Sequence, residues 1–143
     1  MDKLKIINKS GFPLPEYKTE GSAGLDLQAV IDGLGWVEIG GFEQVKIHTG
    51  LYMALPAGYE GQIRPRSSMG HRRLYAFNGT IDSDYRGEII ILLENRSIVP
   101  QTVNHGDRVA QIVFSQCEQL QCEEVKMLPN TKRGANGFGS TGR

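Results

Sequence analysis

The chain has 143 residues, a length that corresponds to one domain with a single hydrophobic core. Its 16 basic residues balance 16 acidic residues, so the formal net charge is zero. A protein that grips a nucleic-acid backbone needs a surplus of basic residues, because its affinity comes from neutralising phosphates. The charge balance therefore disfavours a nucleic-acid partner and favours a small anionic ligand held in a local basic pocket.

The N-terminal sequence and the cysteines bear on where in the cell the protein is located. The apolar run within residues 3–8 is too short for a signal peptide, and no stretch approaches the 18 apolar residues of a membrane span. Cys117 and Cys122 lack the C-x-x-C spacing of zinc and redox motifs, and the three histidines are scattered. We interpret the cysteines as reduced thiols, and we expect a cytoplasmic protein with no membrane partner.

The hydrophobic pattern predicts strands along most of the chain. Eighteen glycines and six prolines favour frequent turns. Apolar residues alternate with other residues over positions 44–55, as expected for a strand buried on one face. The apolar runs at residues 88–93 and 108–114 predict strands buried on both faces. The predicted strands cover residues 3–7, 24–30, 44–55, 59–65, 88–93 and 108–114.

Helical periodicity is nearly absent from the sequence. One short helix is predicted from Ser67 or Ser68 to Arg73, with a serine as its N-cap. Residues 116–128 fit either period, and we interpret them as a strand. The pattern therefore predicts an all-β sandwich or barrel formed by residues 1–132. Residues 133–143 are too rich in glycine to hold regular structure unaided, so we expect a flexible C-terminal arm.

Five short segments carry residues that a hydrophobic core does not require. They are residues 23–27, 64–70, 79–88, 106–114 and 133–142. In the first segment Asp26 is flanked by apolar residues, and the simpler interpretation is an edge strand whose carboxylate faces water. In the second, Arg66 and two serines precede the predicted helix, where a guanidinium and backbone amides would bind an anion. A plain capping serine beside a surface arginine is the alternative.

The third and fourth segments carry a possible base and a polar side chain on a buried strand. Asp82, Asp84 and Tyr85 lie close to the buried run at 88–93, which makes a carboxylate there a candidate general base. Ordinary turn chemistry is the alternative. Gln111 is expected to share a face with Val109, and its amide needs a partner, either a ligand or a neighbouring backbone group.

The fifth segment combines glycines with groups that suit a nucleotide. Successive backbone amides in a glycine-rich chain can wrap oxyanions. Arg133 adds charge, Ser140 and Thr141 add hydroxyl donors, and Phe138 offers a ring for stacking on a base. A disordered C-terminus without function is the alternative.

Taken together and in this order, the five segments closely resemble the five motifs of the homotrimeric dUTPase family. The most specific are Gly-x-Ile-Asp-x-Asp-Tyr-x-Gly at residues 79–87 and Arg-Gly-x-x-Gly-Phe-Gly-Ser-Thr-Gly at residues 133–142. The resemblance implies a jelly-roll-like β-barrel that assembles as a homotrimer. It also implies hydrolysis of dUTP to dUMP and pyrophosphate with Mg²⁺, which would keep uracil out of DNA and supply dUMP.

The resemblance further implies a role for each matching residue. Asp82 would deprotonate the water that attacks the α-phosphorus, Tyr85 would exclude a 2′-hydroxyl, and Asp26 would hold hydrated magnesium through water. The implied phosphate contacts are Arg66, Ser67, Ser68, Gln111, Arg133, Ser140 and Thr141. The other implied substrate contacts are Asn78, Gly79, Thr80, Ile81, Phe138 and Gly139, with the Phe138 ring covering uracil.

The implied active site combines three chains. The third segment would come from one subunit, the second and fourth from another, and the arm at 133–143 from the third, closing over the substrate. The stretch between Arg66 and Asp82 looks shorter than in many family members, which leaves open whether the Asn78 side chain or only backbone groups read uracil. Ser68 stands where many members have glycine.

Two other functions fit a chain of this kind. The first is a dCTP deaminase, a relative with the same fold that lacks an arm of the Phe138 type. The second is a regulatory binding protein in which a nucleotide switches a surface. The third and fifth segments favour dUTP hydrolysis over deamination, and a regulatory role could exist in addition.

Overall fold

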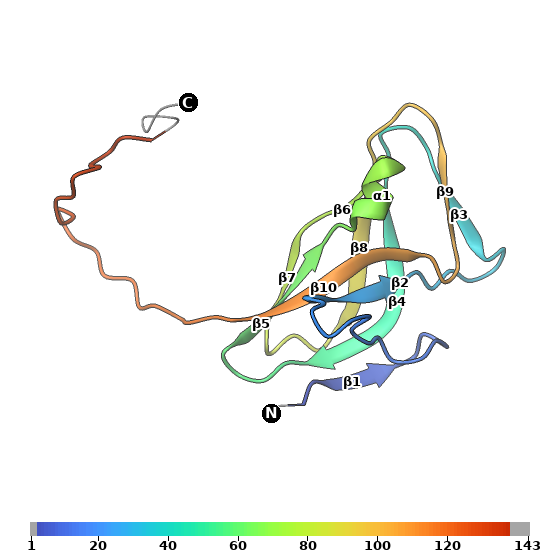
Figure 1. Ribbon diagram of the computed structural model, residues 1–143, viewed down its shortest axis with the longest axis horizontal. Coiled ribbons are helices and arrows are strands. Elements are labelled where there is room, and N and C mark those ends of the chain that lie inside the picture. Colours follow the sequence, from blue (N-terminus) through green and yellow to red (C-terminus); the bar gives the residue numbers. More distant parts are fainter. Residues whose placement is uncertain (1–2, 138–143) are drawn as a thin grey trace.

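Two four-stranded antiparallel sheets pack face to face in the computed structural model, which describes residues 3–137 (Figure 1). The strand orders are β1-β4-β8-β6 and β2-β10-β5-β7, and β3 pairs with β9 as a separate ribbon. The all-β prediction is confirmed. The elements are β1 (Lys5–Asn8), β2 (Gly24–Gln28), β3 (Trp36–Ile39), β4 (Gln44–Ala54), β5 (Tyr59–Arg64), α1 (Ser67–His71), β6 (Leu74–Ala76), β7 (Gly79–Ile81), β8 (Glu88–Asn95), β9 (Gln101–Asn104) and β10 (Arg108–Gln116).

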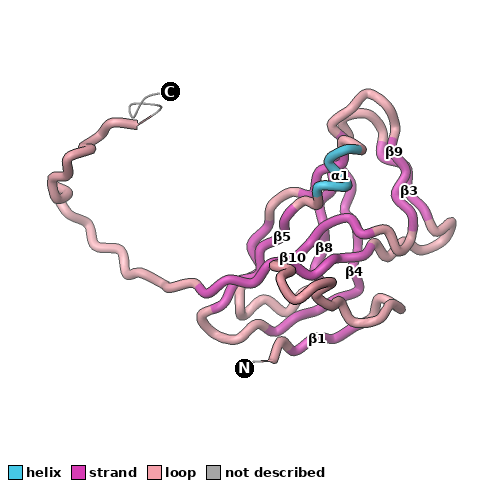
Figure 2. The backbone as a smooth tube through the Cα atoms, in the orientation of Figure 1, coloured by secondary structure: helices cyan, strands magenta, loops and turns pink. Residues whose placement is uncertain are grey.

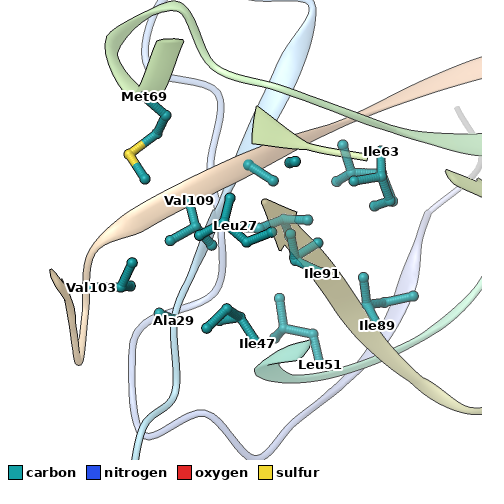
Figure 3. Packing of buried hydrophobic residues seen from close by; sticks show 14 of the residues in the cluster. Leu27, Ala29, Ile47, Leu51, Ile63, Met69, Ile89, Ile91, Val103 and Val109 are labelled. Carbon is teal, nitrogen blue, oxygen red and sulfur yellow. The ribbon is translucent and has the colours of Figure 1, made fainter. Parts of the chain in front are cut away.

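One cluster of apolar side chains fills the space between the sheets (Figure 3). Its members alternate along most of the strands, because successive side chains of a strand point to opposite faces. Burial of each leucine or isoleucine side chain contributes about 1.5–3 kcal/mol. The largest side chains of the cluster that are fully enclosed are Leu27, Ile39, Met53, Leu74, Ile89, Ile91, Leu93, Val103, Val109 and Ile112.

The six strands predicted at residues 3–7, 24–30, 44–55, 59–65, 88–93 and 108–114 are present, and β8 differs from the prediction in its burial. β8 was expected to be buried on both faces, but its side chains alternate between the core and the outer surface, and Ile90 is 39% exposed. The strands that the sequence pattern did not reveal are β3, β6, β7 and β9, each of three or four residues. Such short segments contain too few periods for a pattern to be recognised.

The predicted strand at residues 116–128 is wrong. β10 ends at Gln116, and the chain then runs away from the sheets as an extended segment without regular structure (Figure 2). A strand requires a neighbour with which to exchange backbone hydrogen bonds, and this segment lies beside no sheet edge of its own chain. The proposed boundary between core and arm at residue 132 stays a prediction.

The predicted helix exists but begins differently. α1 spans Ser67–His71, and Arg66 is its N-cap, with extended φ and ψ of −99° and 142° and no capping side-chain hydrogen bond. The predicted serine cap is therefore wrong. Met69 is buried in the core and anchors this single turn to the sheets. Within residues 3–137, no helix is long and apolar enough to cross a membrane.

A β-bulge changes which side chains of β10 face outward. The register with β2 shifts between Arg108 and Ala110, and Val109 and Ala110 are both fully buried. Two consecutive residues thus point inward, as a bulge allows. The expectation that Val109 shares a face with Gln111 is wrong, and Arg108 instead joins Gln111 on the outer face.

A carboxylate on β8 fixes an irregularity in β4. Glu88 accepts hydrogen bonds from the amides of Thr49 (3.2 Å) and Gly50 (2.8 Å) and lies 2.9 Å from His48 Nδ1. Gly50 has a φ of 66°, and a Cβ there would come within 2.6 Å of the Ser10 backbone, so the position requires glycine. The pairing of β4 with β8 shifts register at this point.

The bonds to Glu88 make its ionised form part of the fold. Burial raises the pKa of the Glu88 carboxyl, but the hydrogen bonds from His48 and from two backbone amides, together with the His48 charge, lower it, so the net pKa lies below the ordinary 4.5. A carboxyl with a lowered pKa stabilises the folded state above its ordinary pKa, and this stability is lost as the pH falls through the lowered value.

We predict that Glu88→Gln lowers the free energy of unfolding at pH 7 by roughly 1–3 kcal/mol, because buried amides lose a charged acceptor. The variant should also lose less stability than the original chain when the pH falls below 4.5. Denaturant unfolding at several pH values measures both effects. Glu118→Gln, in the exposed chain after β10, serves as the control and should change neither. Equal acid sensitivity of the Glu88 variant and the original chain would contradict the prediction.

Candidate functional site

Two arginines share one carboxylate on the outer face of the second sheet. Asp26 on β2 lies opposite Gln111 of β10. Its Oδ1 is 2.7 Å from Arg66 Nε, and its Oδ2 is 3.2 Å from Arg108 Nη1. The side chains of Asp26 and Arg66 are 18% and 21% exposed. Charge-assisted hydrogen bonds at such partly desolvated positions are stronger than those in open water.

Arg66 is held by further bonds as well. Its Nη1 donates to the backbone carbonyl oxygen of Arg108 (3.0 Å) and to Ser68 Oγ (3.2 Å). Because Met69 anchors α1 in the core, the backbone of Arg66 has a fixed position above β10. The Arg66 guanidinium therefore links the first, second and fourth segments singled out in the sequence, at residues 23–27, 64–70 and 106–114.

A pocket of about 460 Å³ opens beside this network, and we call it the basic pocket. It contains three cations, Lys18, Arg66 and Arg108, against the single carboxylate of Asp26. An excess of positive charge in a concave surface attracts anions of several charges. The remaining lining residues are Ser22, Ala23, Gly24, Ser67 and Gln111.

A second pocket, of about 520 Å³, contains the start of the third segment. Gln111 lines both pockets, and its Nε2 donates to the backbone oxygen of Pro65 (3.1 Å). Of the two partners considered for this amide, the structure thus provides the neighbouring backbone. The other lining residues are Gln62, Ile63, Arg64, Pro65, Asn78, Gly79 and Thr80.

The chain crosses from the first sheet to the second between β6 and β7. β6 pairs with β8 in the first sheet, and β7 pairs with β5 in the second. The residues between them, Phe77 and Asn78, are exposed and make the crossing. Asn78 still reaches the second pocket, whereas Ile81 packs against the core.

The acidic loop after β7 lies outside both pockets. Asp82 and Asp84 are exposed, and Tyr85 is 42% exposed. The Tyr85 hydroxyl donates to the Glu88 carbonyl oxygen (3.0 Å), and a Cβ at Gly87 would collide with the Tyr85 ring. The glycine thus allows the ring to fold back on its own loop. Within one chain, Asp82 and Tyr85 do not line the basic pocket.

The carboxylates do not form a metal cage by themselves. Among residues 3–137, no group of three histidine, cysteine, aspartate or glutamate side chains could hold a metal ion. Magnesium usually retains several waters and binds one or two carboxylates together with ligand phosphates. Asp26, which already contacts two arginines, is the single carboxylate among the residues that line the basic pocket.

The described chain after β10 extends away from the two sheets (Figure 1), and none of its residues lines either pocket. After Cys117 the described residues are exposed up to Asn136. Arg133 donates from Nε to the Asn136 carbonyl oxygen (2.8 Å) within a local turn. The other predicted contacts of this segment lie outside the described residues. They are Phe138, Gly139, Ser140 and Thr141.

The sequence pattern did not identify three polar residues of the basic pocket: Lys18, Ser22 and Arg108. Arg108 is three positions from Gln111, so regular alternation would place it on the opposite, core-facing side of β10. Only the bulge brings it outward, and the sequence carries no clear signal for a bulge. Lys18 and Ser22 belong to an irregular loop before β2, where periodicity gives no information.

Comparison with known proteins identifies relatives along nearly the whole chain. A family model described as dUTPase matches residues 10–142. The deoxyuridine 5'-triphosphate nucleotidohydrolase of Finegoldia magna is 45% identical over 143 residues, covering 98% of this chain and 99% of that protein. The protein of the same name from Anaplasma marginale is 46% identical over 142 residues, covering 97% of this chain and 95% of the relative.

Solved structures show the same fold at lower identity. A Staphylococcus bacteriophage 80alpha dUTPase with dUPNHPP superposes with a TM-score of 0.90 at 22% identity, covering 100% of both chains. A dUTPase from phage phi11 of S. aureus, described with a structural Mg(II) ion, has a TM-score of 0.80 at 20% identity, covering 90% of this chain and 100% of that chain. At these identities the likeness concerns the fold alone.

We predict that Gly24→Ala disturbs the junction of the two pockets. A Cβ at Gly24 would lie 2.7 Å from Gln111 Oε1, so the amide has to shift, and we expect this shift to weaken its bond to Pro65. The expected loss is about 0.5–1.5 kcal/mol in the free energy of unfolding, measured by denaturant titration. Gly21→Ala is the matched control, since a Cβ at Gly21 meets nothing within 4 Å. Equal effects of the two substitutions would contradict the prediction.

Proposed function

Because the chain belongs to the dUTPase family, we propose that it hydrolyses dUTP to dUMP and pyrophosphate. The match to relatives at 45–46% identity over nearly their full length carries this proposal. The basic pocket supports it, since three cations around one carboxylate suit a ligand with several phosphates. The zero net charge of the chain favours a small anion over a polymer.

The proposed reaction is an in-line displacement at the α-phosphorus. Asp82 takes a proton from water, the water oxygen forms a bond to the α-phosphorus, and the bond from that phosphorus to the bridging oxygen of the β-phosphate breaks. Pyrophosphate leaves with the electron pair. General-base help of this kind contributes roughly 10²–10⁴ in rate. Arg66, Ser67, Ser68 and Gln111 orient the phosphates, as donors do in phosphoryl transfer.

Magnesium fits the donor set of the basic pocket. Asp26 would hold the hydrated ion through water, and the phosphates would bind it directly. When bound, the ion neutralises phosphate charge. Arg66 and Arg108 remain near the same carboxylate, so the protein offers both cations and an acceptor at one place.

In this proposal the second pocket selects the uracil base, and the acidic loop after β7 selects the deoxyribose. Asn78 offers an amide that can donate to uracil O4 and accept from N3–H, and Gly79, Thr80 and Ile81 follow it in the chain. Cytosine reverses both hydrogen-bonding groups and would leave buried groups unpaired. The Tyr85 ring, folded over Gly87, would lie against the deoxyribose and exclude a 2′-hydroxyl.

We infer a homotrimer with active sites shared between subunits. Asp82 and Tyr85 lie outside the basic pocket of their own chain, so a second copy is needed to bring a base to the phosphates. The chain after β10 carries exposed apolar side chains that a neighbouring copy would cover. They are Leu120, Val125, Met127 and Leu128. Arg133, Phe138, Gly139, Ser140 and Thr141 would then reach the substrate of another subunit.

We also infer a cytoplasmic location. Cys117 and Cys122 are both free and exposed. Exposed thiols that remain unpaired are typical of a reducing compartment.

The direct test measures pyrophosphate release from dUTP, UTP, dCTP and TTP, with and without Mg²⁺. We expect rapid release from dUTP with Mg²⁺ and rejection of dCTP by a factor of roughly 10⁴ or more, because buried polar groups would be left unpaired. Absence of pyrophosphate release from dUTP would overturn the proposed function. Ammonia released from dCTP would indicate a deaminase instead.

Asp82→Asn tests the proposed base. The amide keeps the shape of the side chain but cannot accept the proton, so we expect kcat for dUTP to fall by roughly 10²–10⁴ while binding persists. Asp84→Asn is the control, since Asp84 is an exposed carboxylate of the same loop. Steady-state kinetics of both variants give the comparison. A normal kcat for Asp82→Asn would remove Asp82 from the mechanism.

A further inference from the structure

The network around Asp26 places two demands on Arg66. Its guanidinium bonds the Asp26 carboxylate through Nε (2.7 Å), and a second, longer contact joins Nη2 to Oδ2 (3.5 Å). The proposed function also requires the same guanidinium for the substrate phosphates. A guanidinium has a limited number of donors in a fixed planar arrangement, so turning to a phosphate weakens its hold on Asp26.

Arg108 is placed to compensate for that loss. The bulge in β10 turns its side chain outward, and Nη1 lies 3.2 Å from Asp26 Oδ2. Arg66 Nε contacts the other carboxylate oxygen, and Arg66 reaches Oδ2 only through the longer Nη2 contact. Arg108 can keep its contact when Arg66 moves.

Two other polar side chains near Asp26, those of Gln28 and Lys18, have partners elsewhere. Gln28 donates from Nε2 to the carbonyl oxygen of Gly106 (3.1 Å). Lys18 Nζ lies 3.1 Å from a carboxylate oxygen of Glu16, in the loop before β2. Arg108 is therefore the second cation that contacts the Asp26 carboxylate directly.

We propose that Arg108 is a positioning residue that holds the Asp26 carboxylate in place when Arg66 turns to the triphosphate. This inference rests on the proposed function, since it requires a polyphosphate in the basic pocket. Without Arg108, Asp26 would retain Arg66 more strongly and would repel the approaching phosphates without a compensating charge. Substrate binding would suffer more than the proton transfer, because Asp82 lies outside this network.

The test compares Arg108→Gln with Arg108→Lys in dUTP hydrolysis and in calorimetric binding of dUPNHPP. We expect Arg108→Gln to raise KM and the Kd of dUPNHPP by roughly threefold to tenfold, a size typical of the interaction energy between charged residues in one network. We expect little change in kcat. Arg108→Lys should restore most of the binding, because one donor suffices for the single contact to Oδ2. Arg72→Gln is the control, since it removes another partly exposed arginine–aspartate pair (39% and 32% exposed).

A double-mutant cycle separates positioning from direct phosphate binding. If Arg108 acts through Asp26, Arg108→Gln should have no further effect on Kd in an Asp26→Asn background. An undiminished effect there would show a direct phosphate contact and overturn the inference. An unchanged Kd for Arg108→Gln in an otherwise active enzyme would overturn it and leave the proposed function standing. If the original chain neither binds dUPNHPP nor hydrolyses dUTP, both proposals fail.

Discussion

The bulge in β10 is the constraint on which the arrangement of the site depends. β10 lies between β2 and β5, so its outer face decides which polar groups meet at the centre of the second sheet. One extra residue sends Val109 and Ala110 together into the core and turns Arg108 outward. The core thus gains an apolar side chain, and the outer face gains the cation that contacts Asp26. Packing and charge placement follow from the same backbone irregularity.

The sequence alone predicted the longer elements of the fold and missed the local departures from regularity. The alternation over residues 44–55 has enough periods to identify β4, whereas β6 and β7 have three residues each. The segment 116–128 was interpreted as a strand because its apolar residues suit one, yet its own chain provides no partner. Residue patterns report burial, but hydrogen-bonding partners depend on the tertiary structure.

The site was predictable to a different extent in each segment. Resemblance to a family singled out Asp26, Arg66 and Gln111, and the structure brings these three together around one pocket. The resemblance gave no role to Arg108. The outward direction of the Arg108 side chain depends on the bulge in β10, for which the sequence carries no clear signal. Asp82 was singled out as the base, but the tertiary structure places it outside the basic pocket of its own chain, and no residue pattern expresses that separation.

The distribution of charge matters more for ligand choice than its sum. Sixteen basic and 16 acidic residues cancel over the whole chain, so the chain has no overall basic surplus with which to neutralise a nucleic-acid backbone. Lys18, Arg66 and Arg108 nevertheless converge on one pocket in which Asp26 is the single carboxylate. Such local concentration attracts a compact anion with several charges, since screening by salt limits each charge to a range of about 10 Å. Neutrality overall and a cationic pocket locally together favour a free nucleotide over a polymer.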